Sequence, residues 1–88
     1  MTMQIATGQV TLVTGTATQI VAARAGRKEL RLQGLQTSSL VGPDDSLTAS
    51  NGFRYAIDTA SIPTEEAVWG IRVSGTGVVS YMEIYDAA

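Results

Sequence analysis

Apolar and polar residues alternate along much of this chain, and the alternation is most regular between residues 68 and 85. Gly75 and Thr76 divide this stretch into two runs rich in valine, isoleucine and aromatic residues. A period of two is typical of strands with one buried face. Glycine at the first central position favours a type II′ turn, which joins adjacent antiparallel strands. The pattern therefore predicts a β-hairpin centred on Gly75-Thr76.

One face of this hairpin is apolar, and we expect it to point into the core. Pairing across the turn places Trp69 opposite Met82 on that face, and Gly70 opposite Tyr81 on the other. The tyrosine ring would then lie over the bare glycine backbone. We expect Trp69 and Phe53 to be buried. The predicted inward face consists of Ala67, Trp69, Ile71, Val73, Val78, Ser80, Met82 and Ile84.

Shorter alternating segments precede the hairpin, and turn-forming residues separate them. The predicted strands are 9–14, 17–22, 29–33, 40–41 and 53–58. Pro63 lies in a connector, because proline is excluded from central strands. Six to eight short strands with tight turns predict a single all-β domain over residues 1–88. Its expected architecture is a small antiparallel β-sandwich of jelly-roll-like type.

Composition adds an expectation of self-association. The chain has 88 residues, and it contains no cysteine and no histidine. Domains of this size often depend on disulfides, metals or partner subunits for stability. The composition excludes disulfides and metal sites built from thiolate or imidazole ligands. We therefore expect a homo-oligomer.

Charge and hydropathy argue against two classes of partner. Six Lys and Arg residues and a net charge of −2 are too little positive charge for a nucleic-acid surface. Apolar runs are far shorter than the roughly 20 residues that span a bilayer. The first residues also lack the pattern of a signal peptide. We expect synthesis in the cytoplasm and no membrane association.

The residue types needed for common catalytic sites are missing. Without histidine or cysteine, the usual general base and thiolate nucleophile are absent, and the serines have no imidazole to activate them. Asp44 and Asp45 follow Gly-Pro, where aspartate favours turns, and they lack the spacing of a calcium loop. We therefore predict no enzymatic activity and no catalytic, cofactor-binding or metal-binding residues.

Charged and aromatic residues provide the candidate interface. A basic strip and an acidic set would each be either ordinary solvated charge or the complement of a neighbouring subunit. Tyr81 and Tyr85 would form contact surface, or Tyr81 would merely cover Gly70. The basic strip comprises Arg24, Arg27, Lys28 and Arg31, and the acidic set comprises Asp44, Asp45, Glu65 and Glu66.

The order of several short motifs resembles that of a known family. Residues 16–23 read TATQIVAA, 27–33 RKELRLQ, 40–42 LVG, 48–53 TASNGF, 67–71 AVWGI and 74–77 SGTG. This order is similar to that of small virion proteins of tailed bacteriophages. Their common plan runs T-A-T-x-I/L-V-A-A, R-x-x-L-x-I/L-Q-N, V-Y-V/L-G, T-x-x-N-G-F, V/I-W/Y-A-I and S-G-T. Gln33-Gly34 departs from the Q-N of the plan, and the segment before Val41 departs from its V-Y.

The resemblance implies a structural β-sandwich without catalytic residues. It implies a capsid decoration (cement) protein that binds the major capsid protein on the capsid surface and stabilises the head. A trimer is favoured over a dimer, because many decoration proteins of this kind sit at threefold positions. A head-fibre, neck or tail-attachment domain is the alternative. A carbohydrate-binding module is a weaker alternative.

Overall fold

The protein is an all-β sandwich. A computed structural model of the chain describes residues 2–35, 39–48, 50–54 and 59–86. These residues contain no helix, and hence none long and apolar enough to cross a membrane. The strands they form are β1 (Met3–Leu12), β2 (Thr18–Val21), β3 (Arg27–Gln33), β4 (Ser39–Gly42), β5 (Thr59–Ile62), β6 (Val68–Arg72) and β7 (Gly77–Asp86).

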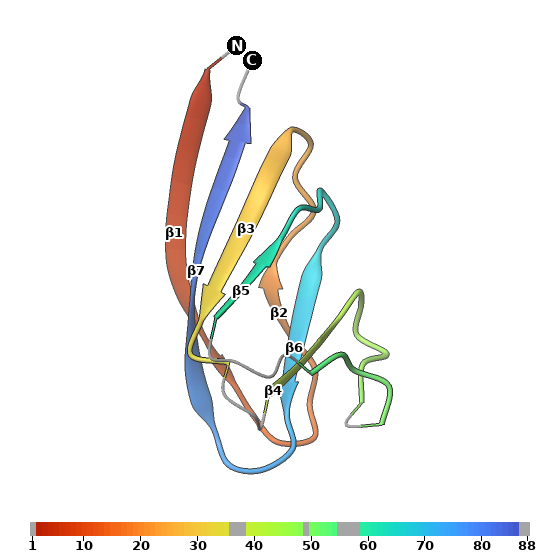
Figure 1. Cartoon of the computed structure of the whole chain (residues 1–88). Coiled ribbons are helices and arrows are strands. Elements are labelled where there is room, and N and C mark those ends of the chain that lie inside the picture. The colour runs from red at the N-terminus through yellow and green to blue at the C-terminus, as the bar shows by residue number, and fades with distance from the viewer. Residues whose placement is uncertain (1, 36–38, 49, 55–58, 87–88) are drawn as a thin grey trace.

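The strands form two antiparallel sheets that face each other (Figure 1). The large sheet has the order β1-β7-β3-β5, and the small sheet has the order β2-β6-β4. Successive strands belong to alternate sheets, so every connection crosses from one sheet to the other. This connectivity is that of a jelly roll. The predicted antiparallel sandwich is therefore confirmed.

Phe53 extends the small sheet beside β4. Its N–H donates to the carbonyl of Val41 at 2.8 Å, and the Val41 N–H donates to the carbonyl of Phe53 at 2.9 Å. This pairing of Val41 with Phe53 lies at the edge of the small sheet where a jelly roll of eight strands has its eighth strand. The predicted strand at 53–58 falls mostly on residues 55–58, which lie outside the described residues.

The predicted hairpin of residues 68–85 is wrong. β6 pairs with β2 and β4, whereas β7 pairs with β1 and β3. Gly75 has the positive φ that was expected, 69°, but residues 73–76 carry the chain from the small sheet to the large one. Alternation and a turn glycine identify two strands and the bend between them. They do not identify the neighbour with which each strand pairs.

The predicted inward face of β7 is also wrong. Val79 is fully buried, whereas Val78 is 52% exposed. Both faces of β7 carry apolar side chains, with Tyr81 on the inner face and Met82 on the outer face. The apolar residues on its outer face thus left no clean contrast in the sequence between the two faces.

Apolar residues on β6 pack on both sides of the small sheet. Val68 faces the large sheet, whereas Ile71 is buried in a second cluster with Leu40 and Leu47. Trp69 packs against this second cluster and is only half-buried. Neither Trp69 nor Phe53, which is 63% exposed, is buried as expected.

The main core lies between the sheets and is largely aliphatic. Burying each such side chain stabilises the fold by about 1.5–3 kcal/mol. Gly70 lets the sheets approach closely, because a Cβ there would lie 2.8 Å from a methyl group of Leu12. The core residues are Leu12, Ile20, Val21, Leu30, Leu32, Leu35, Val41, Val68 and Val79.

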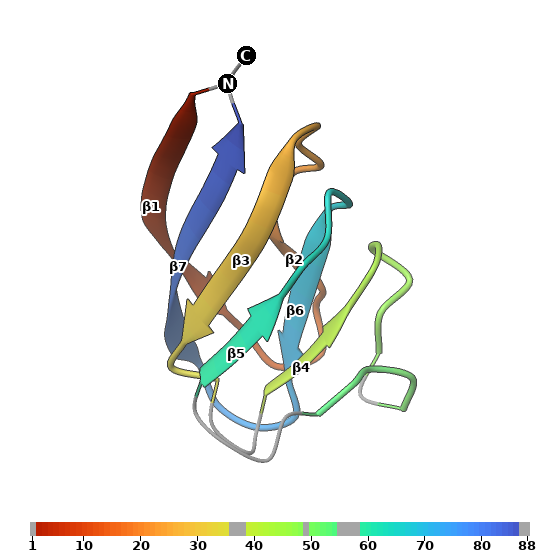
Figure 2. The same cartoon turned by 45° about the horizontal axis from the view of Figure 1, so that its top comes forward.

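β1 and β7 form a long ribbon that extends past the small sheet (Figure 2). They pair continuously from Met3–Asp86 to Leu12–Gly77. Odd-numbered residues of β1 and even-numbered residues of β7 share the outer face of the large sheet, as their register requires. This ribbon positions the surface described next.

Candidate docking surface

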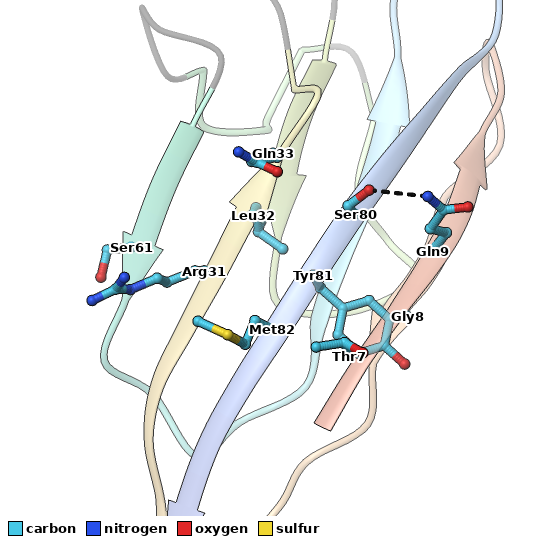
Figure 3. A pocket seen from close by; sticks show the side chains of 10 residues that line it. All are labelled: Thr7, Gly8, Gln9, Arg31, Leu32, Gln33, Ser61, Ser80, Tyr81 and Met82. Atoms are coloured by element: carbon cyan, nitrogen blue, oxygen red, sulfur yellow. Dashed lines mark hydrogen bonds between the residues drawn. The ribbon is translucent and has the colours of Figure 1, made fainter. Parts of the chain in front are cut away.

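The outer face of the large sheet contains an open hollow of about 840 Å³. Figure 3 shows the side chains around it, which come from all four strands of the sheet. The lining residues are Thr7, Gly8, Gln9, Arg31, Leu32, Gln33, Ser61, Ser80, Tyr81 and Met82.

Neutral polar groups form one row across this hollow. Gln9 pairs with Ser80, which pairs in turn with Gln33 on the other side of β7. The Gln9 side-chain amide donates to the Ser80 hydroxyl at 3.3 Å. Adjacent strands bring these side chains together because directly opposed residues point to the same face. The row offers hydrogen-bonding groups that carry no charge.

A charged pair lies at the β3–β5 side of the hollow. Arg31 Nε lies 3.2 Å from a Glu29 carboxylate oxygen, and the Ser61 hydroxyl donates to the same oxygen. The hydrogen bond from Ser61 and then that from Arg31 lower the pKa of Glu29 below its ordinary value. Glu29 is thus held as a carboxylate and balances the charge of Arg31.

The β1–β7 side of the same face is partly apolar, and its only charged residue within these two strands is Asp86, opposite Met3 at one end. Met3, Ile5 and Val78 are 49%, 65% and 52% exposed, respectively. Interface cores are depleted in charge and enriched in methionine and aromatic residues. We call this surface the neutral strip, and it consists of Met3, Ile5, Thr7, Gln9, Thr11, Val78, Ser80, Met82 and Ile84.

Arg27, a member of the predicted basic strip, is buried. Its side chain is 0% exposed and contacts a Glu83 carboxylate oxygen through Nη2 at 2.8 Å and Nε at 2.9 Å. Nη1 donates to the carbonyls of Thr64 and Glu66 at 3.0 and 2.7 Å, and Nη2 donates to the carbonyl of Ala22. Arg27 therefore ties internal segments together and is not available to a partner.

The other basic residues occupy different surfaces. Arg24 lies 3.2 Å from Glu83 and stacks 4.0 Å above the centre of the Tyr85 ring. Lys28 is exposed, and Arg31 lies on the outer face of the large sheet. The basic residues thus share no single strip. An interface role for Arg24, Lys28, Arg31 and Tyr85 stays a prediction.

Tyr81 belongs to the inner face of the large sheet. It packs against the main core, and its ring lies over Gly8 of β1 rather than over Gly70. A Cβ on Gly8 would lie 2.5 Å from the tyrosine oxygen. The expectation that Tyr81 covers Gly70 is thus wrong, because the ring covers a glycine on another strand. An additional contact role for its exposed part stays a prediction.

Members of the acidic set hold turns in place. The Asp44 carboxylate accepts a hydrogen bond from the Ser46 N–H at 2.9 Å and another from the Ser46 hydroxyl. The hydroxyl bond and then the N–H bond lower the pKa of Asp44 below its ordinary value. Glu65 accepts a hydrogen bond from the Gly26 N–H at 2.7 Å. In the described part of the chain, no three Asp or Glu residues gather into a group that could hold a metal ion.

Sequence reasoning missed Glu83 as well as the neutral strip. In β7, Glu83 shares its face with Val79 and Tyr81, and that face is buried. A carboxylate on a buried face requires a cationic partner. Once the face is known, this rule points to a buried arginine such as Arg27.

No protein-family model, curated protein or solved structure gives a significant match to this chain.

Proposed function

We propose that this protein is a decoration (cement) protein of a tailed-bacteriophage head. It binds the major capsid protein at the capsid surface, associates with its own copies and stabilises the shell. The neutral strip is the surface that docks on the shell. The order of the sequence motifs suggests this role, and the exposed, uncharged and partly apolar side chains of the neutral strip support it.

The neutral strip supports docking because it combines exposure with the absence of charge. Ile5 and Val78 lie in the open on a face whose backbone is fixed by continuous pairing of β1 with β7. A rigid face loses little conformational entropy on binding. The Glu29–Arg31 pair at the other side of the hollow would set orientation at the edge of a contact.

The jelly-roll connectivity is compatible with this role. Jelly rolls occur in viral capsid and lectin domains, and the fold alone determines neither function. Glycan recognition favours aromatic platforms. Tyr81 and Tyr85 belong to the inner face of the large sheet, and Trp69 packs on the small sheet. The described outer face of the large sheet thus lacks an aromatic platform, which favours protein docking over glycan binding.

Many copies on one shell would turn modest contacts into firm attachment. A lattice presents its binding sites at fixed distances, so a second contact forms at high effective concentration. A small face without a deep pocket then suffices for stable attachment.

The proposal predicts saturable binding to expanded, empty capsid shells, with a copy number that follows the symmetry of the shell. The variant Ile5→Glu places a charge in the exposed part of the neutral strip, opposite the uncharged Ile84. It should weaken shell binding by about tenfold or more, because an unpaired charge would be buried in the contact. The control Thr76→Glu adds the same charge at an exposed position outside the strip and should bind as the wild type does. Co-sedimentation with shells measures both.

Other copy numbers would identify the alternatives. A handful of copies per virion, measured by quantitative mass spectrometry, would point to the fibre, neck or tail role and would contradict decoration. Equal binding of Ile5→Glu and the wild type would remove the neutral strip as the docking surface.

A further inference from the structure

β1 is an open edge of the large sheet. It pairs with β7 on one side and has no neighbour on the other side among the described strands. In an antiparallel edge strand, alternate N–H and C=O groups point away from the sheet. Over ten residues this edge offers a row of unpaired backbone groups about 33 Å long.

β1 lacks the features that usually prevent edge pairing. Natural edge strands are shortened, bulged, or interrupted by charges or proline. β1 pairs with β7 over its whole length without a register shift, and it contains no proline. The other described edges differ. β2 and β5 have four residues each, β2 pairs irregularly, Pro63 follows β5, and β4 is bridged by Phe53.

The charge pattern indicates what covers this edge. No charged residue occurs from Thr2 to Ala23, which includes the whole of β1. When two identical strands meet around a twofold axis, any charge near the axis meets a like charge, and this destabilises the pair. A strand without charge is therefore self-compatible. A partner recognised through complementary charge would find none on β1.

We propose that β1 pairs antiparallel with β1 of a second copy of this chain. A twofold axis perpendicular to the sheet keeps the two outer faces on the same side. Odd-numbered residues then oppose odd-numbered ones, and even-numbered residues oppose even-numbered ones. The registers that use most of β1 are centred on Thr7 or on Gly8. In both registers the Thr7 side chains of the two copies lie close together.

This dimer deepens the proposed function, on which its biological use rests. Edge pairing joins two four-stranded sheets into one sheet of eight strands. The two neutral strips then lie next to each other and form one docking surface on two chains. The twofold arrangement differs from the trimer that the family resemblance implies, and the two assemblies have different masses.

The test measures the mass of the full chain in solution. Light scattering behind size exclusion, over roughly 10 µM to 1 mM, should give twice the 9.2 kDa mass of one chain. Thr7→Lys and Thr7→Glu each place like charges at the axis, so each should weaken dimerisation by about fivefold or more. Mixing the two variants should restore a dimer, because unlike charges then meet. Thr76→Lys and Thr76→Glu, away from β1, should remain dimeric.

Circular dichroism establishes that each variant is folded. A second measurement needs no variant: hydrogen exchange of the wild type should slow in β1, but not in β5, as protein concentration rises. A wild-type monomer, a trimer, or a dimer that persists unchanged in Thr7→Lys would overturn the inference. None of these outcomes depends on capsid shells. Failure of the dimer is therefore distinguishable from failure of shell binding.

Discussion

Arg27 and Glu83 form a buried polar cluster beside the aliphatic main core. All five N–H donors of Arg27 have acceptors, which include the Glu83 carboxylate and three backbone carbonyls. The cluster connects β3 and β7 to the segments around residues 22 and 64–66. Removing water from two charges is costly, and complete hydrogen bonding offsets that cost. The cluster therefore fixes the relative position of four chain segments.

Replacing Arg27 should destabilise the protein strongly. Arg27→Met leaves the Glu83 carboxylate buried with only the partly exposed Arg24 as a partner. We expect the free energy of unfolding to fall by about 3–5 kcal/mol, measured by urea denaturation.

Two further variants control this prediction. The double variant Arg27→Met, Glu83→Leu should recover much of the loss, because neither charge then remains buried. Arg31→Met removes an exposed arginine and should change stability by less than about 1 kcal/mol. Additive losses in the double variant would show that the pairing of the charges is unimportant.

The sequence located these arginines but not their surroundings. Arg27 and Arg31 are both odd-numbered, so a regular strand would place them on one face. A register shift between Arg27 and Glu29 instead turns Arg27 inward and leaves Arg31 outward. A bulge inserts one residue and reverses the alternation beyond it. Nothing in the sequence RKE marks that insertion.

At the scale of the element, β7 is the strand on which most of the fold depends. It pairs with β1 along its entire length and with β3 on its other side. Its presence and approximate limits could be predicted from alternation alone. Its partners could not, because both neighbours lie far away in the sequence and local pattern does not encode them.

Adjacent valines in β7 provide a direct test of its orientation. Val79→Thr buries a hydroxyl in the main core and should lower the free energy of unfolding by about 1–3 kcal/mol. Val78→Thr makes the same chemical change at a half-exposed position and should stay within about 0.5 kcal/mol of the wild type. Thermal or urea unfolding measures both.

A larger loss of stability in Val78→Thr than in Val79→Thr would instead support the hairpin register predicted from the sequence. That register places Val78 inside and Val79 outside.

At the scale of the whole molecule, the sheets are assembled from distant parts of the chain. The first and last strands are neighbours, and successive strands lie in opposite sheets. The fold class could be predicted because strand number, strand length and turns are local properties. The docking surface could not, because it depends on which residues of β1 and β7 share a face.

This connectivity predicts slow folding. Contacts between distant residues require long loops to close before they stabilise anything. We expect refolding in milliseconds to seconds rather than in microseconds. Stopped-flow fluorescence of Trp69, the only tryptophan, measures the rate in dilute protein. Microsecond refolding would contradict the expectation that closure of long loops limits the folding rate.

The pairing of Met3 with Asp86 has a mechanical consequence. The start of β1 and the end of β7 lie side by side at one pole of the molecule (Figure 1). Tension applied to both ends would peel β1 from β7 one hydrogen bond at a time, as a zip opens. Load spread over a sheet face would strain many of these bonds together. The molecule would thus resist force through its broad surfaces and yield to force at its tips.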